Sequence, residues 1–285
     1  MNVVHFFDPN TWTLTYLVYD ADTLDAVIID PVLDYDPLSV ETSTSSADKV
    51  ADEAERLGLN VHYVIDTHAH ADHLSGMAHL KERLGAKMAI GAEIGAVQSV
   101  FKGVFNLDPA FPTDGSQFDA LLHDGEALEA GSLSILPIHS PGHTPACYVY
   151  QIRDAIFTGD VMFMPDFGTG RCDFPGGSAN DLYDSIQRLY ALPGDTRVFV
   201  GHDYQPGGRE LKCETTIDAC RTENIQLRHD TTREEFVTWR TARDETLRPP
   251  KLIFQSLQVN VNAGTLPEPE DNGMRYLRMP MGVFS

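Results

Sequence analysis

Histidine and aspartate side chains gather where predicted strands end. The segment THAHADH follows a short, mostly apolar strand predicted over residues 61–66, and it places four donors within six residues: His68, His70, Asp72 and His73. Three further predicted strands end in turns with one donor each, namely His143 in HSPGHT, Asp160 in TGD and His202 in GHDY. Loops at one edge of a sheet can converge on a ligand that a rigid scaffold positions. The chain is therefore expected to fold so that these strand ends meet.

Donors of this kind suit a transition-metal ion. Histidine together with carboxylate favours zinc, iron or manganese over magnesium or calcium. TGD or GHD alone indicates little, because Gly and Asp are common in turns. Three imidazoles and a carboxylate within six residues, however, would repel one another when protonated and serve no packing purpose. The sequence therefore predicts a metal site. His139 is expected to be structural or to support a ligand, and five histidines lie in no motif: His5, His62, His79, His123 and His229.

Hydrophobic periodicity predicts strands and helices along the rest of the chain. Strands are expected over 3–7, 13–19, 25–30, 61–66, 87–91 and 196–201, with consecutive strands within 125–140 and 146–160. Helices are expected over 47–60, 74–85, 93–105, 179–192, 210–227 and 232–248, with a further short helix after Lys251. Residues 31–47, rich in Pro, Asp, Ser and Thr, are expected to form a surface loop, and residues 264–273 to be exposed. We expect one α/β domain over residues 1–285, with sheets inside, helices outside and a helical extension from about residue 205.

The charge balance narrows the class of partner. The 285 residues include 21 Lys and Arg against 42 Asp and Glu, a formal net charge of −21. Nucleic acid and anionic membrane are not expected as partners, because both reward clustered basic residues. The N-terminus has no basic region followed by an apolar one, and no stretch approaches about 20 apolar residues. The four cysteines form no CxxC pair, so reduced thiols and a cytoplasmic location are expected. A homodimer, the commonest assembly of soluble enzymes, is compatible with this sequence.

The motifs THAHADH, PGHT, FTGD and GHDY, in this order and at these separations, resemble those of the metallo-β-lactamase superfamily over about residues 28–204. The resemblance implies an αββα sandwich, with two central mixed β-sheets flanked by helices and metals at one rim. The segments IIDPVLDYDP, VIDTHAHADHLSG, FTGD, GRCDF and GHDY are most similar to the persulfide dioxygenases. Glyoxalase II is the nearest alternative. Its members usually carry a GCGR element after the TGD turn and a long C-terminal helical domain, whereas this chain has MPDFGTGRCDFPGG and fewer residues after GHDY.

The resemblance implies a ligand set as well as a fold. The dioxygenases use one Fe(II), whose ligands correspond here to His68, His143 and Asp160, and such a set leaves positions open for a substrate sulfur and for oxygen. In binuclear hydrolases the positions of His70, Asp72, His73 and His202 also bind metal, whereas in the dioxygenases they look like residues that orient ligands and solvent. A hydrolase would use all seven donors to hold two zinc ions, which lower the pKa of bound water. The donors alone leave both hypotheses open, and the resemblance favours iron.

The resemblance also implies a substrate, glutathione persulfide, which is oxidised with O2 to sulfite and glutathione. Arg171 of GRCDF and Tyr204 of GHDY match positions that contact the glutathione part, although Arg171 could instead pair with Asp173 and Tyr204 could pack in the core. Arg209 and Lys212 are further candidates, because a helix beginning there would face an anion with its N-terminus. A zinc thioester hydrolase of the glyoxalase II type is the main alternative. A noncatalytic metal-binding protein on the same fold is a lesser one, since it would be expected to lose donors that this chain keeps.

Overall fold

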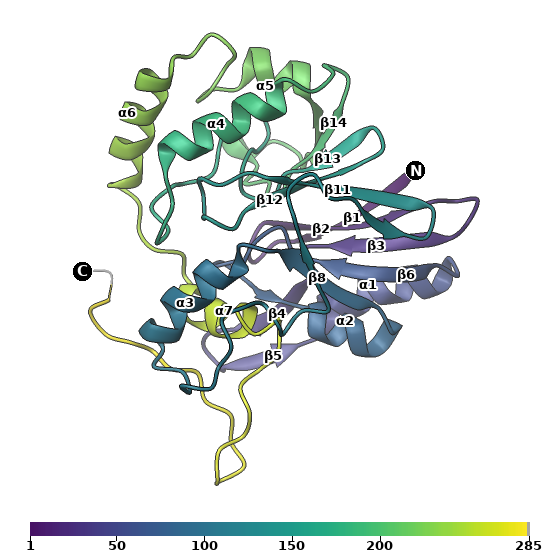
Figure 1. Cartoon of the computed structure of the whole chain (residues 1–285), viewed down its shortest axis with the longest axis vertical. Coiled ribbons are helices and arrows are strands. Elements are labelled where there is room, and N and C mark those ends of the chain that lie inside the picture. Colours follow the sequence, from purple (N-terminus) through teal and green to yellow (C-terminus); the bar gives the residue numbers. More distant parts are fainter. Residues whose placement is uncertain (284–285) are drawn as a thin grey trace.

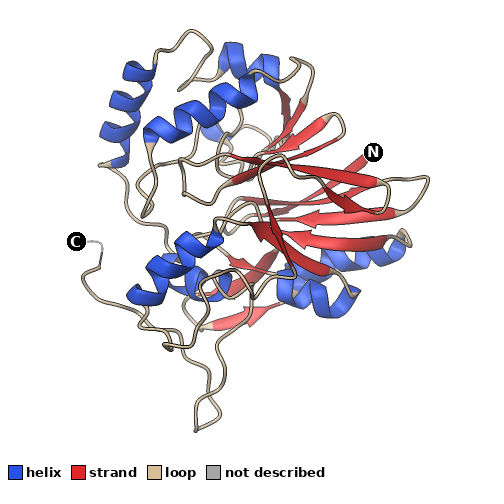
Figure 2. Ribbon diagram, viewed as in Figure 1, coloured by secondary structure: helices blue, strands red, loops and turns tan. Residues whose placement is uncertain are grey.

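Two β-sheets face each other in the middle of the molecule, and helices cover their outer faces (Figures 1 and 2). The computed structural model describes residues 1–283. This is the arrangement that the sequence predicts, an αββα sandwich with two central mixed sheets. Helices α4, α5 and α6 lie on one side of the sandwich, and α1, α2, α3 and α7 lie on the other (Figure 1).

The first sheet has the strand order β1-β2-β3-β6-β8-β9. Its strands are β1 Asn2–Asp8, β2 Thr13–Tyr19, β3 Asp25–Ile29, β6 Asn60–Ile65, β8 Lys87–Gly91 and β9 Ala120–Leu122. β1, β2 and β3 are antiparallel, whereas β3, β6, β8 and β9 run parallel. Because parallel strands end at the same edge, the residues after β3 and β6 lie together.

The second sheet has the order β10-β11-β12-β13-β14-β15. Its strands are β10 Leu128–Ala130, β11 Leu133–His139, β12 Tyr148–Ile152, β13 Ala155–Phe157, β14 Arg197–Phe199 and β15 Glu214–Thr216. β13 and β14 are parallel, and two antiparallel steps through β12 give β11 the same direction as β13. The turns that follow β11, β13 and β14 therefore share one edge of this sheet.

Helices and a small third sheet complete the fold. The helices are α1 Ser45–Arg56, α2 Met77–Leu84, α3 Ile94–Val104, α4 Ala179–Tyr190, α5 Ile217–Glu223, α6 Arg233–Asp244 and α7 Ile253–Asn260. β5 Glu41–Ser43, β4 Val32–Asp36 and β7 Leu74–Ser75 form the third sheet. Within residues 1–283, every helix is too short or too polar to cross a bilayer.

Aromatic side chains fill the space between the two large sheets. Tyr16 of β2 packs edge-on against Phe157 and Phe199 of the second sheet, with ring centroids 5.3 and 5.4 Å apart. Its buried hydroxyl donates to the carbonyl of Val200 at 2.6 Å. Burying a side chain of this size contributes roughly 1.5–3 kcal/mol, and the hydrogen bond ties the first sheet to the end of β14. The sheets are thus held in the register that brings their edges together.

Two segments differ from the sequence-based expectation. Residues 31–47 contain β4, β5 and the start of α1 rather than a loop alone. Residues 210–227, expected to be helical, form β15 and then α5, because residues 214–216 pair with β14 at the edge of the second sheet. The other predicted helices and strands are confirmed, with ends shifted by a few residues, and α7 is the short helix expected after Lys251.

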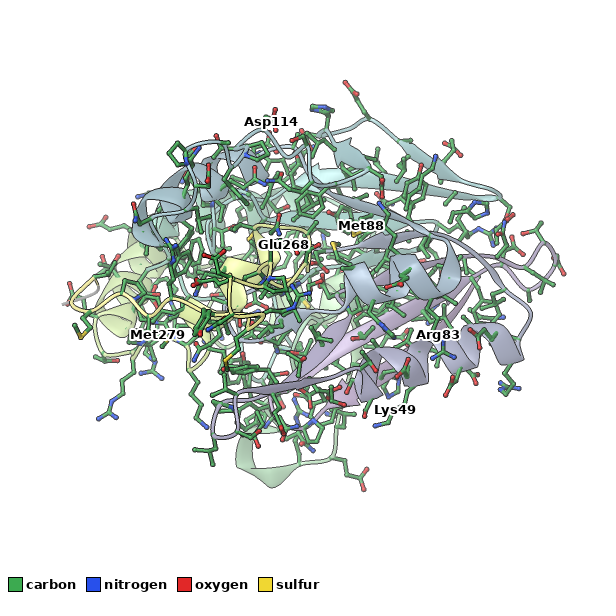
Figure 3. All side chains as sticks on the ribbon, turned by 90° about the horizontal axis from the view of Figure 1, so that it is seen from below. Lys49, Arg83, Met88, Asp114, Glu268 and Met279 are labelled. Carbon is green, nitrogen blue, oxygen red and sulfur yellow. The ribbon has the colours of Figure 1, made fainter. Side chains whose placement is uncertain are left out.

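The surface carries the acidic residues and the C-terminal tail. Arg83 of α2 forms ion pairs with three carboxylates of α1, those of Asp48, Asp52 and Glu55. Figure 3 shows Arg83 on this outer side of the molecule, and Glu268 and Met279 on the tail. The sequence predicts exposure over residues 264–273. Residues 265–273 are exposed or half-buried, whereas Gly264 is buried.

Candidate metal centre

The predicted donors meet where the edges of the two sheets face each other. Close contact between the turns requires glycine at two positions. Gly159 has φ +47°, and a Cβ there would lie 2.3 Å from Oγ1 of Thr67, the residue before His68. A Cβ on Gly201 would lie 2.8 Å from the carbonyl carbon of Gly159. The glycines of TGD and GHD therefore let three ligand-bearing turns touch.

His68, His143 and Asp160 form one compact donor set. One potential ligand atom from each lies within 4.8 Å of the other two. Nε2 of His143 is 3.5 Å from Asp160 Oδ2. The Nδ1–H of His143 donates to the backbone carbonyl of Arg171 at 2.7 Å, because a carbonyl can only accept. This contact fixes the tautomer and leaves the lone pair of Nε2 free to bind a cation.

His70 and His73 belong to neighbouring donor sets. His70 forms one set with Asp72 and His73, and another with Asp30 and Asp66. Nε2 of His70 is 3.1 Å from Asp30, and Nδ1 of His73 is 3.1 Å from Asp72. These contacts occupy one nitrogen of each ring and leave the other for a ligand.

His202 lies between the two carboxylates. Its Nε2 is 3.2 Å from Asp160 Oδ1 and 3.5 Å from Asp72 Oδ2. All seven predicted donors are thus brought to one place. Among residues 1–283, however, no compact set of three donors includes His202.

Unpartnered buried atoms indicate that the site is built for a cation. Five side-chain atoms around it are buried without a hydrogen-bond partner: Nε2 of His68 and His73, Nδ1 of His70 and His202, and Oδ1 of Asp66. A sixth, Oδ1 of Asp160, has only its ion-pair contact with His202. Leaving one such atom unpaired costs roughly 1–3 kcal/mol. A bound metal ion would supply the missing partner for several of them, so the residues fit a metal.

The pKa shifts show which charges the site favours. Burial and the neighbouring His70 lower the pKa of His68 well below its usual value, which keeps the imidazole neutral as a ligand must be. Burial also opposes charge on His70 and His202. Nevertheless, Asp30 and Asp66 raise the pKa of His70 to about 10, and Asp160 and Asp72 raise that of His202 to about 9. The carboxylates thus create a local field that attracts positive charge.

Asp30 belongs to a candidate donor set with Asp66 and His70, and neither carboxylate is among the donors predicted from the sequence. Asp30 directly follows β3, has φ +51° and is buried. Its carboxylate accepts from the backbone N–H of Thr67 at 2.6 Å and from the Thr67 hydroxyl at 2.9 Å, and it contacts His70. One sequence feature could have indicated Asp30, because it directly follows an apolar strand, as the predicted ligand segments do. Its role depends on β3 and β6 being parallel neighbours, which the sequence alone does not state.

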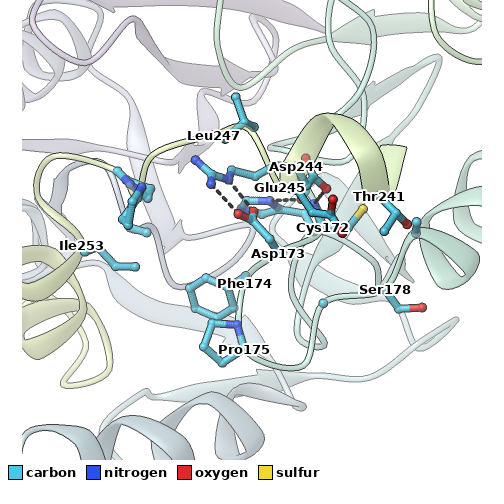
Figure 4. Close-up of a pocket in the computed structure, with 17 residues that line it drawn as sticks. Cys172, Asp173, Phe174, Pro175, Ser178, Thr241, Asp244, Glu245, Leu247 and Ile253 are labelled. Carbon is cyan, nitrogen blue, oxygen red and sulfur yellow. Dashed lines mark hydrogen bonds and ion pairs between the residues drawn. The ribbon is translucent and has the colours of Figure 1, made fainter. Parts of the chain in front are cut away.

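A cavity of about 480 Å³ opens beside the donor set. His143 is the donor that lines it. Figure 4 shows its walls, which come from the segment Cys172–Ser178, from the end of α6 and from the residues up to Ile253. The volume is within the usual range for small-molecule sites, and most of the lining surface is apolar.

The four predicted substrate-binding residues lie in different surroundings. Arg171 lines the cavity, but its guanidinium pairs with both carboxylate oxygens of Asp173 and also donates to the carbonyl of Arg248 at 2.8 Å. Tyr204 lies next to the metal centre rather than on the cavity wall. Its ring stacks on His202, with centroids 5.5 Å apart.

Arg209 and Lys212 lie outside the cavity. Arg209 pairs with Asp166 and Asp203, and Lys212 is exposed. The prediction that a helix begins at this point is wrong. A 3₁₀ turn over Pro206–Gly208 precedes an irregular segment, which then joins β15. The physical argument for an anion site at these two residues is therefore lost.

Comparison with protein families agrees with this geometry. The profile described as the metallo-β-lactamase superfamily matches residues 13–202. The chain is 49% identical to a probable metallo-hydrolase of Burkholderia pseudomallei, with all of both chains covered. A β-lactamase hydrolase-like protein of Agrobacterium fabrum is 50% identical over 98% of this chain, which spans 64% of that longer protein. A Dictyostelium discoideum protein named glyoxylase B2 is 45% identical, with 94% of this chain and 92% of that protein covered.

Two further comparisons concern proteins named ETHE1. The human mitochondrial persulfide dioxygenase ETHE1 is 32% identical, with 90% of this chain and 87% of the human protein covered. The crystal structure of ETHE1 from Myxococcus xanthus is 30% identical and superposes with a TM-score of 0.74, covering 93% of this chain and 100% of that one.

Proposed function

Within the metallo-β-lactamase superfamily, to which the chain belongs, we propose that it acts as a mononuclear iron persulfide dioxygenase. The proposed reaction consumes glutathione persulfide, one O2 and one water, and gives glutathione, sulfite and two protons. One observation carries the proposal: His68, His143 and Asp160 form a compact set that His70 and His202 do not join.

Two imidazoles and one carboxylate are a ligand set typical of Fe(II) oxygenases. A bound Fe(II) would supply a redox-active centre with open positions for a sulfur and for O2. The remaining donors have partners that suit a supporting role, since His70 contacts Asp30 and His73 contacts Asp72. Such contacts orient a metal site without adding ligands to it.

The cavity gives the substrate access to this set. His143 is both a proposed ligand and part of the cavity wall, so a group bound in the cavity would lie next to the proposed metal ligands. Apolar walls, including Phe174, Leu247 and Ile253, would exclude water around the reacting sulfur. Arg171 is the basic residue of the wall and would face a carboxylate of the glutathione part. The relative named persulfide dioxygenase supports the same substrate class.

A binuclear zinc thioester hydrolase is the second candidate. All seven donors lie at one edge of the sandwich, as such an enzyme requires. Relatives of higher identity are named a glyoxylase and a probable metallo-hydrolase. With two zinc ions, the site would supply a hydroxide nucleophile instead of a redox centre.

Metal analysis combined with two assays separates these candidates. The dioxygenase proposal predicts about one iron per chain and O2 consumption on addition of glutathione persulfide. Two zinc ions per chain, with rapid anaerobic release of thiol from S-lactoylglutathione, would refute it. His143→Ala should abolish O2 consumption and lower metal content. His123→Ala removes an exposed histidine that is not one of the seven donors, and it should change neither.

A further inference from the structure

One peptide group joins the metal centre to a buried carboxylate on α6. The carbonyl of Arg171 accepts the Nδ1–H of His143 at 2.7 Å. The N–H of the next residue, Cys172, donates to Oδ2 of Asp244 at 2.8 Å. The carbonyl and the N–H belong to the same planar, conjugated amide. His143 and Asp244 are therefore connected through one rigid unit, and Figure 4 shows Asp244 beside Cys172.

Asp244 is itself held in place. Its second oxygen, Oδ1, accepts from Arg240, one helical turn earlier on α6. Arg240 is 3% exposed and Asp244 is 6% exposed, so neither side chain is free to turn into solvent. Arg240 also contacts Oε1 of Gln226 at 3.3 Å, and this oxygen accepts from the N–H and hydroxyl of Thr169 at 2.9 Å. The segment 169–172 is thus attached at two points to the C-terminal part of the chain.

The same segment lies against both ligand-bearing turns with no spare room. A Cβ on Gly170 would lie 1.9 Å from the carbonyl oxygen of Asp160. A Cβ on Gly177 would lie 2.4 Å from the carbonyl oxygen of Cys172 and 2.9 Å from that of His143. A displacement of the Arg171–Cys172 peptide would therefore be transmitted to the donors.

We infer that Asp244 is a positioning residue of the metal centre, acting on His143 through the Arg171–Cys172 peptide. An amide whose N–H donates to a carboxylate is polarised, and its oxygen becomes a stronger acceptor. That oxygen keeps the proton of His143 on Nδ1 and directs Nε2 towards Asp160. Metal-binding histidines commonly donate to either a carboxylate or a carbonyl. Here the carbonyl of Arg171 contacts the histidine, and the carboxylate of Asp244 contacts the N–H of the same peptide. The inference rests on His143 being a ligand, as in the proposed function, and it holds for either metal and either reaction.

Cobalt binding to the full chain tests this inference. Asp244→Asn keeps the shape of the side chain but removes its charge, and it is expected to weaken Co(II) binding by about tenfold, as loss of a supporting contact does. Glu245→Gln is the matched control, because it removes the same charge from the next residue, which is exposed and lines the same cavity. Its affinity for Co(II) should stay within about twofold of the wild-type value. Equal weakening in both variants would overturn the inference, since it would indicate a general effect of charge.

A spectroscopic signature separates positioning from folding. In the Co(II)-loaded protein, the exchangeable Nδ1–H of His143 should give a paramagnetically shifted proton resonance if His143 binds the ion. Asp244→Asn should move this resonance or speed its exchange with solvent, and Glu245→Gln should not. An unchanged resonance together with wild-type affinity in Asp244→Asn would overturn the inference.

A second variant and a reference variant complete the test. If Asp244→Asn does not fold, Arg240→Lys takes its place, because it keeps the positive charge but not the forked contact with Asp244 and Gln226. It should weaken Co(II) binding by about threefold, and wild-type affinity would overturn the inference. Absence of O2 consumption by the wild type would refute the proposed function and leave these comparisons intact. Unchanged Co(II) affinity in His143→Ala would refute both the ligand assignment and the inference.

Discussion

Asp30 shows how one buried side chain can shape a site without being one of its expected ligands. Its carboxylate accepts hydrogen bonds from the backbone N–H and the hydroxyl of Thr67 and contacts the ring of His70. It thereby orients the start of the HxHxDH segment. It does so from a left-handed backbone conformation, which aspartate tolerates better than most residues. Its removal should therefore affect the folded state before any chemistry takes place.

We predict that Asp30→Ala lowers the free energy of unfolding by about 2–3 kcal/mol, because donors of Thr67 and His70 lose a buried acceptor. Asp30→Asn should cost less, since an amide oxygen still accepts and asparagine tolerates the same conformation. Urea unfolding of the metal-free protein would measure both. Asp22→Ala serves as the control, because Asp22 is exposed. An equal loss for Asp30→Ala and Asp22→Ala would show that Asp30 has no such role.

At this scale the sequence predicted which histidines and aspartates meet, but not the side chains that hold them in place. All seven donors of the four motifs meet, because each motif follows a strand and carries its own turn glycine or aspartate. Asp30 and Asp244 lie outside these four motifs, and their hydrogen-bond partners are 37 to 72 residues away in the chain. Such long-range hydrogen bonds depend on which strands and helices become neighbours.

Among the helices and strands, α6 has the clearest sequence signals for where it begins. Thr232 accepts from the N–H of Glu235, and the Glu235 carboxylate accepts from the N–H of Thr232, a complete capping box. From this start α6 packs against α4, where the ring of Phe236 lies beside that of Tyr183, and Arg240 and Asp244 follow in its last two turns. Hydrophobic periodicity predicts this helix from the sequence, and the capping box seen in the structure is a second local signal that agrees with it.

We predict that Thr232→Ala lowers the free energy of unfolding by about 1 kcal/mol, the usual effect of losing an N-cap. Thr238→Ala is a matched control in the middle of the same helix, where the exposed threonine makes no cap and alanine is the better helix former. Chemical denaturation of the two variants checks this. Indistinguishable stabilities would mean that the capping box does not contribute to the global transition.

Elements that depend on distant partners were the ones predicted wrongly. β4 lies between Pro31 and Pro37 in a segment that reads locally as a turn, and it forms because β7, some 40 residues later, pairs with it. β15 interrupts a stretch with good helix formers, because the open edge of β14 pairs with Glu214–Thr216. In both cases tertiary pairing overrides local propensity.

Across the whole molecule, an ion pair joins turns of the two sheets. Asp20 follows β2 of the first sheet, and Arg153 connects β12 and β13 of the second. The N–H of Asp22 and the guanidinium of Arg153 lower the pKa of Asp20 to about 2. Because this pKa is depressed by folding, the stabilisation is complete above the unfolded value of about 4 and is lost as the pH falls towards 2.

We predict that Asp20→Asn is less stable than the wild type at pH 6, and that the difference becomes smaller as the pH falls from about 4 towards 2. The wild type loses the contribution of this ion pair as Asp20 becomes protonated, whereas Asp20→Asn lacks it at every pH. The two curves of stability against pH should therefore converge at low pH. Unfolding by urea at several pH values would measure this. Asp271→Asn, on the exposed tail, should run parallel to the wild type throughout. A constant gap between Asp20→Asn and the wild type would contradict the prediction.

The peptide between Arg171 and Cys172 also has a consequence for how the protein is made. During synthesis from the N-terminus, the first donors emerge with His68 and the last with His202, but the carboxylate that anchors this peptide emerges only at Asp244. A nascent chain can therefore contain every donor before His143 is fully held in place. Tight metal binding would then come late in folding, and a fragment that ends before α6 should capture the ion weakly although it lacks none of the seven donors.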